Sequence, residues 1–257
     1  MRVLIATDGL GGHSSEEAGA AFARAWAGLG AEVAVVPMAS GGPGLPAALA
    51  SLGCREPVLD LTVGVPDSVP PGAIGVVSAD QLELPLTGLR GLAATQGRLS
   101  GSPLEEVLAG EARWEAWARQ AWPGRDAPDK VPGSGAHQGA GLRVLAAGGR
   151  LTTGEALCAE LAGLDRSAEL ADLVVTGCEV LDFGSFGGPV VAEVLRRAQG
   201  ACRPLIVLAG RSYISARELR SAGIEACYAL DGEDASGTVK LNQLSQLAAR
   251  VARSWAW

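Results

Sequence analysis

The sequence is poor in positive charge. Its 257 residues include 21 Lys and Arg against 28 Asp and Glu, which gives a formal net charge of −7. Lys130 and Lys240 are the only lysines. Because a protein that neutralises a phosphate backbone needs a basic face, this balance argues against nucleic-acid binding. A site for a phosphate group must therefore use arginine side chains or backbone N–H groups.

Long apolar runs are also missing. No stretch approaches the roughly 20 apolar residues that a membrane span requires, and the run that begins at Val3 is too short for the core of a signal peptide. The hydrophobic fraction of 48% against 19% charged residues is enough to bury a core. We therefore expect a globular, cytoplasmic protein without a membrane partner.

Paired cysteines and aromatic residues are scarce as well. The five cysteines are odd in number and include no C-x-x-C pair, so neither a structural zinc site nor a disulfide framework is expected. Aromatic residues make up 4% of the chain, whereas glycine occurs 36 times. Abundant glycine favours close approach of the backbone to a ligand or to other backbone.

The first 52 residues alternate between strand and helix patterns. Val3–Ala6 and Val33–Val36 are short aliphatic runs typical of strands buried in a parallel sheet. Ser14 followed by Glu17 has the spacing of a capping box, and Leu45–Leu52 predicts a second helix. The first helix should bury Ala18, Phe22, Ala25, Trp26 and Leu29 and end at Gly30.

The pattern changes in the middle of the chain and returns near residue 170. Residues 57–103 are rich in Pro and Gly with two strand-like pieces, and a helix is expected over Leu104–Trp122. The later rhythm predicts strands at Leu173–Val175, Leu205–Leu208 and Ala226–Leu230, and helices from Pro189, over Ala216–Ala222 and over Leu241–Trp255. We predict a parallel doubly wound α/β domain (residues 1–57 and 168–257), interrupted by a smaller inserted α/β domain (residues 58–167).

Ligands of parallel α/β sheets bind beyond the carboxyl ends of the strands. Four glycine-rich segments occupy such positions: Thr7–Ser14, Met38–Gly44, Thr176–Asp182 and Ala209–Ser212. Their backbone N–H groups could hold phosphate or carboxylate, although a tight strand-to-helix turn explains each equally well. None has the P-loop or the dinucleotide fingerprint.

Charged candidates lie in or near these segments. Asp8 and Asp182 trail strands and could hold Mg²⁺ or accept a hydroxyl proton, although such residues are often only turn or cap residues. Arg90 and Arg211 are the candidates for clamping an anionic group, with a plain surface role as the alternative. His137 is flanked by glycines and is a weaker candidate.

Five segments of the chain form a set that can be compared with known families: Val3–Asp8, Val36–Gly44, Pro85–Gly91, Val131–Gly139 and Ala171–Asp182. Together they resemble the glycerate kinase family of the bacterial two-domain type. The resemblance implies ATP-dependent phosphorylation of glycerate, a small hydroxy acid, with Mg²⁺ near Asp8 and Asp182. It further implies that Gly11, Gly12, Thr176 and Gly177 bind ATP, and that Arg90, Arg211, Gly41 and Gly42 bind the substrate.

The same comparison shows where this chain departs from that family. A lysine of the first loop falls on Gly11, and charged residues of later loops fall on Ser40, Pro43, Cys178 and Val180. Phosphoryl transfer depends on positioning and on cations set against the transferring group. The alternative is therefore a homologue that binds a hydroxy acid, a nucleotide or a partner without turnover. The sequence leaves the oligomeric state open.

Overall fold

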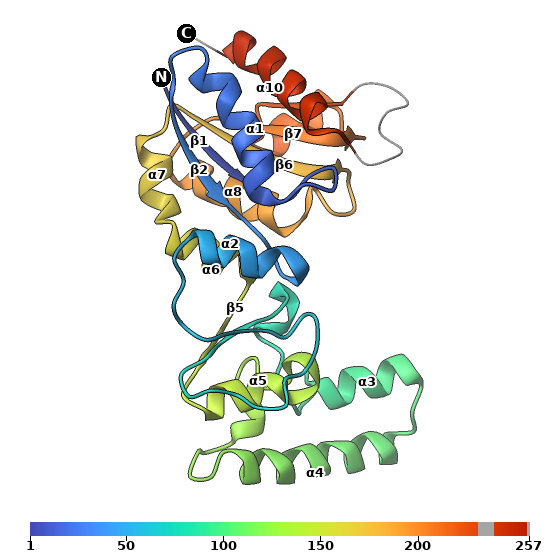
Figure 1. Ribbon diagram of the computed structural model, residues 1–257. Coiled ribbons are helices and arrows are strands. Elements are labelled where there is room, and N and C mark those ends of the chain that lie inside the picture. Colours follow the sequence, from blue (N-terminus) through green and yellow to red (C-terminus); the bar gives the residue numbers. More distant parts are fainter. Residues whose placement is uncertain (231–238, 256–257) are drawn as a thin grey trace. The chain divides into compact units, whose positions relative to one another are not determined.

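The computed structural model describes residues 1–230 and 239–255 and divides the chain into two units (Figure 1). Unit 1 comprises Met1–Cys54 and Glu155–Trp257, and unit 2 comprises Arg55–Gly154. The second boundary lies earlier in the chain than the expected 167/168. The reason is packing: α7 (Leu164–Leu170) contacts β1 and α8 of unit 1, and Cys158 of α6 (Gly154–Leu161) lies against Ala39.

Unit 1 contains a sheet of five parallel strands in the order β2-β1-β6-β7-β8. The strands are β1 (Arg2–Thr7), β2 (Glu32–Pro37), β6 (Leu173–Leu181), β7 (Leu205–Ser212) and β8 (Ala226–Ala229). All are joined by crossover connections, as parallel strands require. The predicted parallel α/β class is confirmed.

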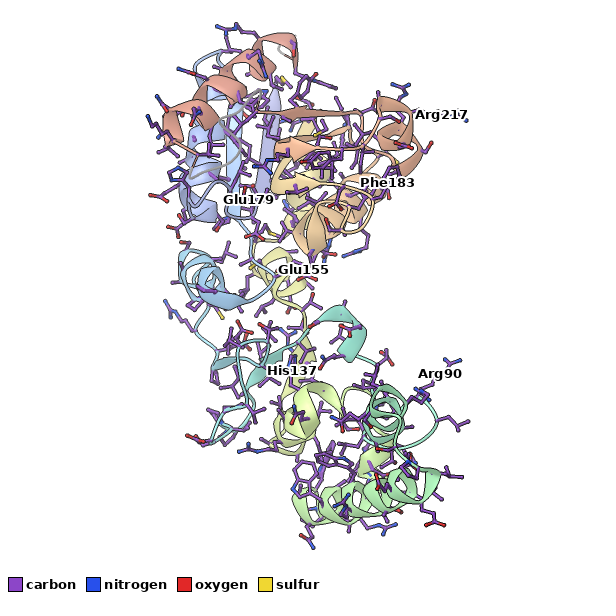
Figure 2. The ribbon with its side chains drawn as sticks, turned by 90° about the vertical axis from the view of Figure 1, so that its right-hand side faces the viewer. Arg90, His137, Glu155, Glu179, Phe183 and Arg217 are labelled. Carbon is purple, nitrogen blue, oxygen red and sulfur yellow. The ribbon has the colours of Figure 1, made fainter. Side chains whose placement is uncertain are left out.

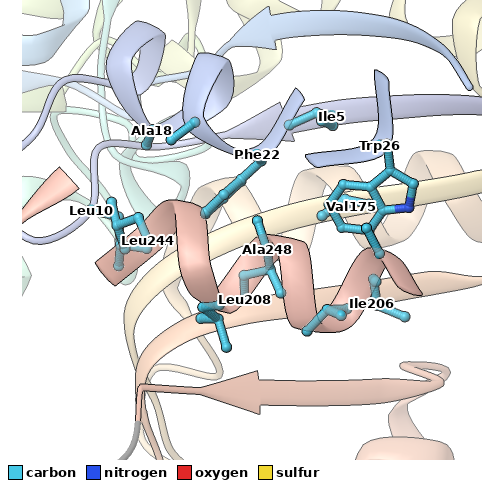
Figure 3. Packing of buried hydrophobic residues seen from close by; sticks show 14 of the residues in the cluster. Ile5, Leu10, Ala18, Phe22, Trp26, Val175, Ile206, Leu208, Leu244 and Ala248 are labelled. Atoms are coloured by element: carbon cyan, nitrogen blue, oxygen red, sulfur yellow. The ribbon is translucent and has the colours of Figure 1, made fainter. Parts of the chain in front are cut away.

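Two helices cover one face of this sheet. Phe22 and Trp26 of α1 (Ser15–Ala27) pack against Leu244 and Ala248 of α10 (Leu241–Trp255) and against alternate strand residues such as Ile5 (Figure 3). Leu4, Val174 and Val207 are buried but lie outside this cluster, as the two-residue strand period requires of side chains on the opposite face. The remaining helices of unit 1 are α2 (Leu45–Ser51), α8 (Gly188–Gly200), α9 (Ala216–Ala222) and the 3₁₀ turn Gly42–Gly44.

The first helix begins as predicted and ends earlier than predicted. Ser14 and Glu17 exchange both hydrogen bonds of the capping box. The helix ends at Ala27 rather than at Gly30, so Leu29 lies outside it and is 48% exposed instead of buried. Ala25 is only partly buried against the core.

Unit 2 contains a second, smaller parallel sheet. Its strands are β3 (Val58–Asp60), β4 (Ile74–Val76) and β5 (Arg150–Thr152), in that order. The helices are α3 (Leu92–Ser100), α4 (Leu104–Ala121) and α5 (Ala136–Ala146), with 3₁₀ turns at Ala79–Gln81 and Pro128–Lys130. The sequence pattern did not predict α3, α5, β5, α6 or α7.

The long helix of unit 2 packs through tryptophans. The Trp114 and Trp117 rings meet edge to face at 5.4 Å, and both lie against Gly139 of α5.

Among the described residues, no helix has the length and hydropathy needed to cross a membrane.

Candidate functional site

The strand order places a topological switch point at β1 and β6 of unit 1. The chain leaves β1 toward β2 on one side, while β6 lies on the other. In open parallel sheets the ligand crevice forms at such a point, beyond the carboxyl ends of the strands. The segments that follow β1 and end β6 are therefore the first place to examine.

The loop after β1 is a tight turn built on two glycines. Leu10 and His13 exchange two backbone hydrogen bonds of 3.1 Å, with Gly11 and Gly12 between them at φ of +66° and +82°. Positive φ at both central positions is the requirement of a type I′ turn, which glycine meets without strain. A Cβ on Gly11 would also lie 2.5 Å from the side chain of Val239, so this position admits only glycine.

A carboxylate of β6 reaches this turn. The N–H of Gly11 donates to Oε1 of Glu179, an exposed residue near the end of β6. Gly210 on β7 leaves room beside it, since a Cβ there would lie 3.2 Å from Oε2 of Glu179. Glu179 therefore occupies an amide of the loop in which the resemblance placed ATP phosphates.

Asp8 immediately follows β1 and is half-buried. Burial raises the pKa of its carboxyl above the ordinary 3.8, and the N–H of Gly9, which donates to Oδ1 at 2.7 Å, opposes that rise. No other hydrogen bond to the Asp8 carboxylate occurs among residues 1–230 and 239–255. A carboxylate that is desolvated and only partly satisfied has an oxygen available for a proton or a cation.

Asp182, just after β6, is held by its own loop. Its Oδ1 accepts from the backbone N–H of Ser185 at 2.8 Å and from the Ser185 hydroxyl at 3.0 Å. These hydrogen bonds lower the pKa of Asp182 below its ordinary value. Asp182 thus has the contacts of a turn residue.

The carboxylates of this edge gather around two buried thiols. Burial raises the pKa of Cys178 to about 12, and the charges of Glu179, Asp182 and Asp8 act in the same direction. Burial likewise raises the pKa of Cys158 to about 11, with a further contribution from Glu155 and Asp8. The charge of Asp8 thus acts on both thiols.

Two of these acids were missed by sequence reasoning. Glu179 belongs to a segment that was expected to be a loop, and Glu155 lies in the first turn of α6, which was not predicted. Glu155, which is labelled in Figure 2, is buried. The signal for Glu179 was the continued apolar alternation after Thr176, and for Glu155 it was Thr153-Gly154 ahead of an apolar run.

The other predicted residues of unit 1 lie in different settings. Thr176 and Gly177 were expected in a loop, but both are buried within β6. Gly177 has no side chain at the point where Thr7 packs, since a Cβ there would lie 2.6 Å from Thr7 Oγ1. Gly41 and Gly42 are half-buried in the loop after β2, and Arg211 is half-buried in β7 opposite Val180.

Unit 2 has a polar cluster of its own. The hydroxyl of buried Thr87 donates to Oδ2 of buried Asp129 and accepts from Lys130 Nζ at 2.7 Å. Lys130 Nζ also lies 3.5 Å from Asp129, and buried Ser134 accepts from the N–H of Leu86 at 3.0 Å. The cluster joins Pro85–Gly91 to Val131–Gly139, two of the segments that carried the family resemblance.

Arg90 and His137 lie in unit 2 (Figure 2). Arg90 is exposed in the loop before α3. His137 has a left-handed backbone, and its buried Nε2 has no hydrogen-bond partner in the described part of the chain. Burial lowers the pKa of His137, while Asp60 and Asp80 oppose that shift.

A magnesium ion that is shared with phosphates would have one candidate protein ligand at this edge, Asp8. Within the described part of the chain, no cluster of three or more His, Cys, Asp or Glu side chains is arranged to hold a metal. Mg²⁺ commonly takes one or two protein carboxylates and completes its shell with phosphates and water. Asp8, with an available carboxylate oxygen, fits that role, whereas the Gly11 amide fits a phosphate only when Glu179 is displaced.

The fold defines a parallel α/β protein, and the switch point of its sheet carries the candidate site. The family model of the glycerate kinase family matches residues 70–256. The chain therefore belongs to the glycerate kinase family.

Relatives support this assignment. Over 187 residues, 70% of this chain and 48% of the relative, the chain is 37% identical to the uncharacterized protein Mb2228c of Mycobacterium bovis. It is 27% identical over 160 residues to a glycerate kinase of Bacillus cereus, covering 61% of this chain and 42% of that protein. The chain thus spans about half the length of the curated relatives that it matches.

A solved structure shows the same fold. A crystal structure described as glycerate kinase 2 of Salmonella typhimurium LT2 superimposes with a TM-score of 0.69 at 16% identity. The match covers 100% of this chain and 97% of that chain. At this identity the likeness supports the architecture, including an α/β sheet divided by a second unit.

Proposed function

We propose that this protein transfers a phosphoryl group from ATP to a hydroxyl group of a small hydroxy acid, with glycerate as the substrate. Family membership supports the reaction class. The observation in this chain that carries the proposal is Asp8, a half-buried carboxylate with a raised pKa at the switch point of the sheet.

Asp8 supplies the chemistry that the reaction needs from a carboxylate. The substrate oxygen forms a bond to the γ-phosphorus, the bond between that phosphorus and the β–γ bridging oxygen breaks, and the hydroxyl proton passes to Asp8. A raised pKa makes this carboxylate a better proton acceptor near neutral pH. Mg²⁺, when bound, would neutralise charge on the phosphates. Of the two roles open to the available oxygen of Asp8, cation ligand or proton acceptor, we assign the second, so Mg²⁺ would be held by phosphates and water.

Asp182 and Asp8 take different roles in this proposal. Asp182 is held through Ser185, which fixes the loop after β6. Its lowered pKa makes it a poorer proton acceptor than Asp8. The two aspartates that the sequence treated alike thus separate into a reacting group and a loop-shaping group.

One observation favours a second candidate, ligand binding without turnover. Gly11 stands where the resembling family has a lysine, and its N–H is held by a carboxylate of the same chain. A loop that lacks the lysine, and whose amide is hydrogen-bonded to a carboxylate, stabilises a transferring phosphoryl group less than a loop with the lysine and a free amide. Loss of one such group typically costs on the order of a hundred-fold in rate.

The experiment that tests the proposal is a coupled assay of ADP release with purified protein, Mg-ATP and D-glycerate. The controls omit glycerate or replace it with D-lactate, which keeps the configuration, the carboxylate and the 2-hydroxyl but has no terminal hydroxyl. Glycerate-dependent ADP release supports the kinase. No release above the glycerate-free rate, from protein with a cooperative unfolding transition, favours the second candidate. Stabilisation by glycerate or ADP would then identify the bound ligand.

A further inference from the structure

The contact between Glu179 and Gly11 joins residues far apart in the chain. Gly11 lies in the turn after β1, and Glu179 lies near the end of β6, the neighbouring strand. The bond runs from a backbone N–H to an ionisable carboxylate, which is stronger than a bond between neutral groups. It is the contact that an oxyanion ligand of this turn would make.

The surroundings leave space for this carboxylate. Gly210 has no side chain where a Cβ would stand 3.2 Å from Oε2 of Glu179 and 2.7 Å from its backbone oxygen. On the other side, Val239 fills the space beside Gly11, and His13 Nε2 lies 2.7 Å from the carbonyl oxygen of Val239. These contacts support the turn independently of Glu179. We therefore expect the turn to keep its conformation when the Glu179 carboxylate moves away from the Gly11 N–H.

We propose that Glu179 is an internal competitor for the oxyanion that binds the Gly9–Gly12 turn. The carboxylate occupies the Gly11 amide in the free protein, and a phosphate or carboxylate group of a ligand binds there only after displacing it. Because Glu179 is exposed, its side chain can turn into solvent without losing packing. The inference rests on the proposed function only in taking this turn as part of the ligand site.

The test compares oxyanion binding by four proteins: wild type, Glu179→Ala, Glu179→Gln and Glu225→Ala. Glu225 is the matched control, since it is an exposed acid at the opposite, amino-terminal edge of the same sheet. Inorganic pyrophosphate and D-glycerate are titrated separately by calorimetry without nucleotide, so that the readout does not depend on turnover. Unfolding transitions establish that each variant is folded.

Competition predicts that Glu179→Ala binds pyrophosphate or glycerate about ten-fold more tightly than wild type, the scale of one exposed charge-assisted hydrogen bond. Glu179→Gln keeps an oxygen that can accept from Gly11 but loses the charge, so its gain should be smaller. Glu225→Ala should bind like wild type. The probe that gains affinity identifies the source of the anion.

Other results overturn the inference. If Glu179 only braces the turn, Glu179→Ala weakens binding. Equal affinity in all four proteins, or equal gains in Glu179→Ala and Glu225→Ala, removes any specific role, and absence of binding in every protein removes the oxyanion site itself. If Glu179→Ala does not fold, the same comparison is made with Glu179→Gln. The separate ADP-release assay measures turnover, whereas calorimetry measures anion affinity. Failure of the competition and failure of the kinase activity are therefore distinguished.

Discussion

Each unit of the protein holds a buried or half-buried aspartate, and the two are satisfied to very different degrees. Asp129 of unit 2 is 3% exposed, accepts from Thr87 and lies 3.5 Å from the Lys130 ammonium. Asp8 of unit 1 is half-buried, and the N–H of Gly9 is its one hydrogen-bond donor among the described residues. A buried charge with partners holds structure, whereas a desolvated charge with few partners is available for chemistry.

The largest effect is expected from a substitution of Asp129, the aspartate whose charge has partners. Asp129→Ala should lower the free energy of unfolding by about 3 kcal/mol, because buried Thr87 loses its charged acceptor and the Lys130 ammonium loses its counterion. Chemical denaturation monitored by tryptophan fluorescence measures the change. Asp126→Ala, at an exposed neighbour, is the matched control and should stay within about 0.5 kcal/mol of wild type. Equal losses in both variants would show that the cluster does not stabilise unit 2.

A second substitution separates packing from ligand binding inside unit 1. Gly177→Ala should cost about 2 kcal/mol, because its Cβ would lie 2.6 Å from Thr7 Oγ1 and 3.1 Å from the Phe22 ring. Gly200→Ala, where a Cβ meets nothing within 4 Å, should be neutral or slightly stabilising. Thermal unfolding of the two variants checks this. If Gly177→Ala has unchanged stability and binds ADP more weakly, Gly177 contributes to ligand binding and not to packing.

Gly177 also shows how far the sequence reasoning reached. Buried aliphatic runs such as Val3–Ala6 were recognised because a strand covered on both faces has few polar residues. Gly177 suggested that β6 ends there, whereas this glycine serves the close approach of Thr7 and the strand continues to Leu181. A local pattern does not show which glycine allows a turn and which allows a neighbouring strand to come close.

The candidate site was predictable to a similar extent. Asp8 could be chosen because a polar residue directly after a buried strand lies at the ligand edge of the sheet. Its difference from Asp182 could not, since that difference comes from burial and from hydrogen bonds to Ser185. The role of Glu179 could not be predicted from local sequence. It depends on the contact between Gly11 and the end of β6, which forms because β1 and β6 are neighbours in the sheet.

A smaller effect sharpens the difference between Asp8 and Asp182 through pH. The raised pKa of Asp8 means that its contribution to stability is full below pH 3.8 and is lost as the pH rises through the folded-state pKa. The lowered pKa of Asp182 has the opposite sign: its contribution is present above pH 3.8 and is lost as the pH falls through the folded-state value.

Urea unfolding at several pH values tests both signs. At pH 7, Asp8→Asn should be more stable than wild type and Asp182→Asn less stable, and both differences should shrink as the carboxyls of wild type become protonated. The same sign for both substitutions at pH 7 would contradict the assigned environments.

The most direct test of the central claim is the glycerate-dependent rate of ADP release by Asp8→Asn relative to Asp182→Asn, measured side by side with wild type. The account predicts a loss of about a hundred-fold or more in Asp8→Asn and a loss of less than about ten-fold in Asp182→Asn, with both variants folded. Equal losses in the two variants, or a rate in Asp8→Asn close to that of wild type, would contradict the assignment of Asp8 as the reacting carboxylate.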